Sequence, residues 1–162
     1  MTDTAPDNVT KPYNTTTGRC WVAMRLLQNH IQAEIQKKHK KINVEQLLLL
    51  MELDYEDGQR PSVLAERMLR SKGTITSLIR HAQQSEYIAS AADPKNRNAK
   101  RLFLTLHGKK TLDELAPIVN NALAECLDHV PDENIAIVND AMNGIIRKFN
   151  PEWFEFEEAE KG

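Results

Sequence analysis

Apolar residues recur every three or four positions along most of this chain, which is the spacing of one face of an α-helix. The first helix predicted in this way spans residues 18–39. Its apolar stripe consists of Trp21, Leu26, Leu27, Ile31 and Ile35. A second helix begins at Asn43, which can form a capping box with Gln46. Residues 47–51 are apolar on every side, so we expect this second helix to be buried.

Two shorter helices follow, with a brief break at residues 69–71 between them. Ser62 is the expected cap of the first short helix, and Ser71 is the expected cap of the second. The second short helix has an apolar face made of Ile75, Leu78, Ile79 and Ala82. Two short helices across a tight turn indicate a helix-turn-helix.

A hairpin is predicted directly after these two helices. Residues 87–92 and 100–105 are the expected strands. In the second strand, Leu102 and Leu104 alternate with Arg101 and Phe103. Residues 93–98 between the strands are polar and turn-forming. A helix-turn-helix followed by a hairpin with a charged tip is a winged helix-turn-helix.

The helices at the ends of the chain carry apolar stripes outside this core. Thr105 is the expected cap of a long helix that runs to about His129 and is kinked near Pro117. A final helix has an apolar stripe made of Ile135, Val138, Met142, Ile145 and Phe149. One chain offers little surface to cover the stripes at both ends, so we expect the end helices of two copies to pack together as a homodimer.

The predicted fold is mainly α with a small β-hairpin wing, and has a winged helix-turn-helix core plus N- and C-terminal dimerisation helices. The expected parts are a flexible tail at 1–17, a helical dimerisation region at 18–42 and 106–149, a winged helix-turn-helix DNA-binding domain at 43–105, and an acidic tail at 150–162.

Positive charge is concentrated in one part of the chain. The formal net charge is −2, yet residues 59–110 contain 11 Lys and Arg against 3 acidic residues. A basic segment within an otherwise acidic protein indicates a polyanionic partner. The basic run 37–41 is interpreted separately, as cations at the C-terminus of the first long helix, in preference to the alternative that it contacts DNA directly.

Several classes of protein are disfavoured by what the sequence lacks. No apolar run approaches the roughly 20 residues that span a bilayer, and the first residues contain no apolar signal segment. We therefore expect a cytoplasmic protein without a membrane partner. Glycine-rich phosphate loops and the HExxH and GxSxG motifs are missing, and the five histidines are scattered. Accordingly, we expect no enzyme activity, no cofactor and no metal site.

The run LAERMLRSKGTITSLIRHAQQSEYIASAADPKNRNAKRLFLTLHG, from Leu64 to Gly108, resembles the core of the MarR family of bacterial transcription regulators. The LAER opening, the S-x-x-T-x-T start of the second short helix, the D-P wing and the closing L-T-x-x-G match in order and without a gap. The flanking helices also fit, so the resemblance covers residues 19–149. The chain departs from the family at three places. Asn96-Arg97-Asn98 replaces the usual D-x-R at the wing tip, Glu86 replaces a glycine after the second helix, and Ser90 replaces an arginine.

The resemblance implies a two-fold dimer that binds double-stranded DNA at a pseudo-palindromic site, often as a repressor. The second short helix would enter the major groove, and the wing would lie over the adjacent minor groove, with Arg97 as the inserted arginine. The expected DNA-binding residues are Ser71, Lys72, Gly73, Thr74, Thr76, Ser77 and Arg80 on the helix, and Lys95, Arg97 and Lys100 in the wing.

Three alternatives remain open for control and for function. The family's commonest effector is a small aromatic or phenolic ligand bound between the dimer helices and the winged domain. Cys20 and Cys126 are placed like the cysteines of peroxide-sensing members, although the tyrosine expected four residues after the first cysteine is Met24. A winged-helix module that contacts proteins and does not bind DNA is the alternative from another class. It predicts an apolar outward face on the second short helix.

Overall fold

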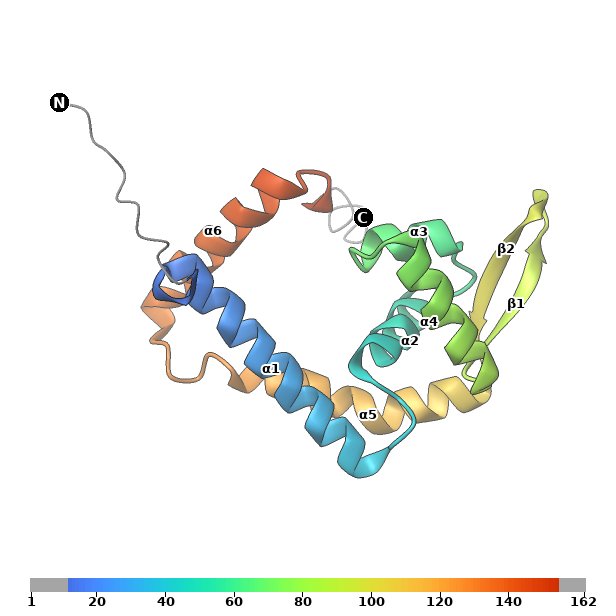
Figure 1. The fold of residues 1–162 in the computed structure, drawn as a ribbon, viewed down its shortest axis with the longest axis horizontal. Helices are drawn as coiled ribbons and strands as arrows, with labels where there is room; N and C mark the ends of the chain where they lie inside the picture. The colour runs from blue at the N-terminus through green and yellow to red at the C-terminus, as the bar shows by residue number, and fades with distance from the viewer. Residues whose placement is uncertain (1–11, 155–162) are drawn as a thin grey trace. The chain divides into compact units, whose positions relative to one another are not determined.

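The computed structural model describes residues 12–154, in which helices predominate and a single hairpin is present (Figure 1). In chain order its elements are η1 (Pro12–Asn14), α1 (Thr16–Lys38), α2 (Val44–Tyr55), α3 (Pro61–Arg67), α4 (Lys72–Gln84), β1 (Ile88–Asp93), β2 (Asn96–Leu104), α5 (Leu106–Glu125) and α6 (Asp132–Phe149). The mainly helical fold with a β-hairpin wing is therefore confirmed. Most of the two predicted tails, at 1–11 and 155–162, lies outside the described residues.

Side-chain caps fix the starts of most of the predicted helices. The Asn43 side chain accepts from Gln46 N at 2.8 Å, and Asn43 N donates to Gln46 Oε1 at 3.1 Å, which confirms the capping box. Ser71 Oγ accepts from Thr74 N at 3.2 Å and caps α4 as predicted. Thr105 Oγ1 caps α5 by accepting from Gly108 N at 2.9 Å.

The predicted cap of α3 is wrong. Ser62 lies inside the first turn, and the capping position is Arg60, which makes no side-chain capping bond. The helix starts at Pro61 because proline has a suitable φ and no N–H group that would need an acceptor in the first turn.

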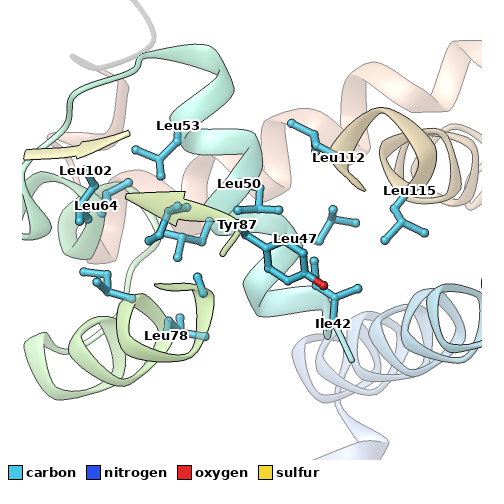
Figure 2. Packing of buried hydrophobic residues seen from close by; sticks show 14 of the residues in the cluster. Ile42, Leu47, Leu50, Leu53, Leu64, Leu78, Tyr87, Leu102, Leu112 and Leu115 are labelled. Carbon is cyan, nitrogen blue, oxygen red and sulfur yellow. The ribbon is translucent and has the colours of Figure 1, made fainter. Parts of the chain in front are cut away.

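The core of the first compact unit, residues 1–122, is built around α2. Leu47, Leu49, Leu50 and Leu53 are fully buried, which confirms that this helix is a buried one. Figure 2 shows labelled α2 leucines in the middle of the cluster, with Leu64 and Leu102 on one side and Leu112 and Leu115 of α5 on the other. The helix-turn-helix and the wing are thereby held on one hydrophobic core.

The hairpin pairs β1 and β2 antiparallel, from Ile88 opposite Leu104 to Ala92 opposite Lys100. The predicted six-residue turn at 93–98 is wrong, because β2 already begins at Asn96. The Asp93 carboxylate accepts from Lys95 N at 2.9 Å, and this local bond closes a tighter turn. The wing is therefore longer than its sequence suggested.

Apolar side chains on the end helices are left uncovered within the chain. In α1, Trp21, Met24 and Leu26 are each more than half exposed. The second compact unit, residues 123–162, contains α6, in which no residue is buried and Phe149 is 77% exposed. Every helix within residues 12–154 is too short or too polar to cross a membrane.

Candidate nucleic-acid interface

Helix α4 divides into a buried face and an outward face. Ile75, Leu78, Ile79 and Ala82 are buried, as the spacing predicted. The opposite face is polar and basic, and its residues are exposed except for Ser77, which is half-buried. This distribution contradicts the apolar outward face that a protein-contact module would need.

The N-terminus of α4 is arranged to receive an anion. The first amides of a helix have no partner within the helix and carry partial positive charge. Ser71 satisfies only the amide of Thr74, and its Oγ also lies 2.9 Å from Thr74 Oγ1. At Gly73 a Cβ atom would meet only Ser71 Oγ, at 3.9 Å, so the protein's own packing does not require a glycine there. Glycine does, however, let the backbone of another molecule approach closely.

The next turns of α4 add groups that can contact bases or phosphates. Thr76 Oγ1 donates to Lys72 O at 2.7 Å, which leaves the hydroxyl oxygen as an acceptor. Arg80 is exposed, and its guanidinium contacts only the His81 ring, at 3.4 Å, among the residues that the structure describes. Its donors are free for the paired acceptors of a guanine edge or for a phosphate.

The wing carries exposed charges around its turn and is anchored at the end of β1. Lys95, Arg97 and Lys100 are exposed. At the end of β1, the Asp93 side chain has no exposed surface and lies 2.7 Å from Arg60 Nη2 and 3.1 Å from Arg101 Nε. The hydrogen bond from Lys95 N and the contacts with the two arginines lower the pKa of Asp93 from 3.8 to about 2. An ionised, buried carboxylate thus fixes the turn of the wing, next to its exposed charges.

Ion pairs separate the basic residues of the segment 59–110 into two groups. One group contacts carboxylates: Arg60 and Arg101 at Asp93, Arg67 at Glu52 and Glu56, Arg70 at Glu45, and Lys109 at Asp54 and Asp113. The other group, Lys72, Arg80, Lys95, Arg97, Lys100 and Lys110, contacts no carboxylate among residues 12–154. Every cation expected at the DNA from the sequence belongs to this second group.

Sequence reasoning missed a connection between α4 and the wing. Gln83 Nε2 donates to Ser90 Oγ at 3.0 Å, so α4 and β1 are joined on the exposed side. No local pattern indicated this contact, because it depends on the return of the chain after Glu86.

The two cysteines lie in different compact units. Cys20 lies in the first compact unit and Cys126 in the second, and both are free and half-buried. Cys126 Sγ donates to Leu123 O at 3.1 Å.

Comparisons with known proteins agree with this geometry. Residues 42–100 match the model of the MarR family. The structure is similar to the S. aureus MepR–DNA complex, with a TM-score of 0.76, 17% identity and coverage of 83% of this chain and 98% of that one. It is also similar to a mutant MarR from E. coli complexed with operator DNA, with a TM-score of 0.75, 12% identity and coverage of 85% and 99%.

A third similar structure is that of Bordetella bronchiseptica BpsR, a protein whose DNA binding is regulated by 6-hydroxynicotinic acid. The TM-score is 0.75 at 13% identity, with coverage of 87% of this chain and 97% of that one. At these identities the structural likeness establishes the fold. The comparison with curated protein sequences gives no match.

Proposed function

We propose that this chain, in which residues 42–100 match the MarR family model, is a DNA-binding transcriptional regulator that acts as a repressor and binds a pseudo-palindromic operator as a homodimer. The observation that carries this proposal is the division of the basic residues. Within residues 59–110, five of the six cations for which the described residues provide no carboxylate partner lie on the outward face of α4 and on the wing, whereas the paired cations join elements of the fold. An unpaired cation beside a phosphate releases counterions from DNA, which favours binding.

The binding mode follows from the two surfaces. A helix of ordinary width fits the major groove, and Arg80 on the outward face of α4 would contact a base edge there. The wing tip would reach the neighbouring minor groove, where a narrow A·T-rich groove concentrates negative potential and favours Arg97. Because Asp93 holds the turn of the wing to Arg60 at the start of α3, the two surfaces would keep a fixed spacing.

The homodimer is supported by the uncovered apolar side chains of α1 and α6. Trp21 and Met24 in α1, and Phe149 in α6, are at least half exposed. A second copy with the same surfaces could cover them under two-fold symmetry. Two symmetry-related α4 helices would then read two half-sites, and the half-sites of such dimers lie about one helical turn apart.

Release of the operator is proposed to depend on a small aromatic or phenolic ligand. Support comes from the structural likeness to BpsR, whose DNA binding is described as regulated by 6-hydroxynicotinic acid. The thiol-based alternative would require a reactive thiolate, and the Cys126 thiol instead donates to a backbone carbonyl.

The proposal is tested by selecting bound sequences from a pool of random duplexes and mapping the recovered site by hydroxyl-radical footprinting. We expect an inverted repeat with two protected regions about one helical turn apart. A recovered site without internal symmetry would contradict the homodimer. A pool that is not enriched would contradict sequence-specific binding altogether.

A further inference from the structure

A basic groove of about 650 Å³ lies at the C-terminal end of α4, on the side away from Ser71. Its walls come from the end of α1 and the following loop, the end of α4, and the start of α5. Aromatic rings form a firm part of its lining. The Tyr87 ring is stacked on His107 at 5.1 Å and meets the edge of His39 at 6.2 Å.

The groove is positively charged because its lysines lack carboxylate partners. Lys38, Lys40 and Lys41 line it, are exposed, and make no ion pair within the described part of the chain. Glu86 is the one carboxylate in the lining. Lys37, in the same basic run, differs from these three because it is paired with Glu34.

Stabilisation of the α1 C-terminus does not account for these lysines. Helix α1 ends at Lys38, so only Lys37 and Lys38 lie in its last turn, where cations offset the helix dipole. Lys40 and Lys41 follow the helix in the loop. Since the dipole effect is confined to the last turn, their position needs another explanation.

The groove is continuous with the outward face of α4. Gln84 lines the groove, and it follows Arg80 by four residues and Ser77 by seven. This spacing places all three side chains on one face of a helix. A molecule that lies along the outward face of α4 therefore meets the groove at the end of that face.

The length of α4 indicates which part of a DNA duplex would reach the groove. Thirteen residues correspond to roughly 20 Å of helix, whereas the major groove is about 12 Å wide. The two ends of α4 would therefore approach the two rows of phosphates that border the major groove. At its N-terminus, free amides suit a phosphate, but the carbonyls at its C-terminus repel one, so cations from another element are needed.

We propose that this basic groove is a second phosphate-binding site, in which Lys40 and Lys41, assisted by Lys38, bind the DNA strand opposite the one at the N-terminus of α4. The inference rests on the proposed DNA binding and extends its footprint to the loop between α1 and α2. It favours the alternative interpretation of the run 37–41, direct contact with DNA, for the lysines that follow the last turn of α1.

The test compares full-length variants by fluorescence anisotropy on a labelled duplex that carries the selected site, at several salt concentrations. The double variant Lys40→Ala/Lys41→Ala should reduce the slope of log affinity against log salt by about two, since each lost phosphate contact accounts for roughly 0.9. The matched control, Lys37→Ala/Lys109→Ala, removes two lysines that are already paired with carboxylates and should leave the slope close to that of the wild type. Lys40→Arg/Lys41→Arg should retain the slope.

A neutral methylphosphonate at the contacted phosphate locates the site directly. It should weaken binding of the wild type but should have little effect on the Lys40→Ala/Lys41→Ala variant. If the wild type binds and this variant keeps its full salt slope, Lys40 and Lys41 make no contact with DNA phosphates, and the inference is overturned. If the wild type itself does not bind, the proposed function fails, and the inference fails with it.

Discussion

Arg60 Nη2 lies 2.7 Å from Oδ2 of Asp93, a side chain with no exposed surface. Arg60 Nε donates to the same oxygen at 2.8 Å, although the two residues are 33 positions apart in the chain. The pair joins the start of α3 to the end of β1, and Arg101 contacts the same carboxylate from β2. The orientation of the wing is therefore set inside the domain, and its exposed charges remain free for a partner.

Asp93 should make the free energy of unfolding depend on pH in the acid range. Its pKa is lowered from 3.8 to about 2 in the folded protein, so its contribution is complete above the ordinary pKa and is lost as the pH falls through about 2. Asp93→Asn should be less stable at neutral pH, because two arginines lose their partner. It should also lose less stability than the wild type between about pH 4 and pH 2. Urea denaturation across pH 2–6 measures this difference, and parallel profiles would refute the role of the carboxylate.

Gly73 is a position at which a substitution should change the affinity for DNA without reducing the stability of the fold. An added Cβ meets no protein atom closer than 3.9 Å, and alanine is favoured over glycine inside a helix by up to about 1 kcal/mol. Gly73→Ala should therefore keep or raise the melting temperature while it weakens DNA binding. Gly144→Ala in α6 is the control, because it also meets no neighbour within 4 Å. It should raise stability and leave affinity unchanged, whereas equal affinities for the Gly73 variant and the wild type would exclude close approach of DNA.

Arg80 is the residue most directly expected to read sequence. Arg80→Ala should cost about 1–3 kcal/mol of binding free energy and relax the preference at one base position. Arg70→Ala is a suitable comparison, because Arg70 Nη2 is paired with Glu45 at 2.7 Å. That change should affect stability by at most about 1 kcal/mol and should leave base preference intact. Titrations on the mapped site and its single-base variants distinguish the two, and unchanged base preference in Arg80→Ala would show that the outward face is misassigned.

The backbone of Glu86, which follows the end of α4, is strained. Its φ is +58°, in the left-handed region that side chains disfavour. Glu86→Gly should stabilise the protein by roughly 1 kcal/mol, as measured by chemical denaturation. Glu86→Gln removes the same charge but keeps the strain, so it should not produce this gain. If both variants are stabilised equally, the effect comes from the charge and not from the backbone.

Local features of the fold were predictable because their causes are local. The apolar positions of α4 repeat with the helical period, and Ser71 and Asn43 satisfy backbone amides three residues away. The winged helix-turn-helix followed from the order of such elements. Ser62 was misassigned as a cap because proline at the first helical position started the helix one residue earlier.

Which cations are paired with carboxylates could not be predicted from the sequence, because the ion pairs join residues that are far apart in the chain. Arg70 pairs with Glu45 across 25 positions and Lys109 with Asp54 across 55, and no periodic pattern records such pairs. The net charge of the basic segment can be counted from the sequence. Only the structure distinguishes the cations that are paired with carboxylates from those that lack such a partner. The groove beside Lys40 was missed for the same reason, since the end of α1, the end of α4 and the start of α5 form it together.

The central claim is that unpaired cations on α4 and the wing bind operator DNA. Its most direct test is an anisotropy titration of the wild-type protein on the selected duplex and on a scrambled duplex, at several salt concentrations. The account predicts tight binding to the selected duplex, two chains per site, and a steep loss of affinity with salt, by about 10³–10⁵ between 50 and 200 mM for six to ten phosphate contacts. Failure to bind even at low salt, or an affinity that does not change with salt, would contradict it.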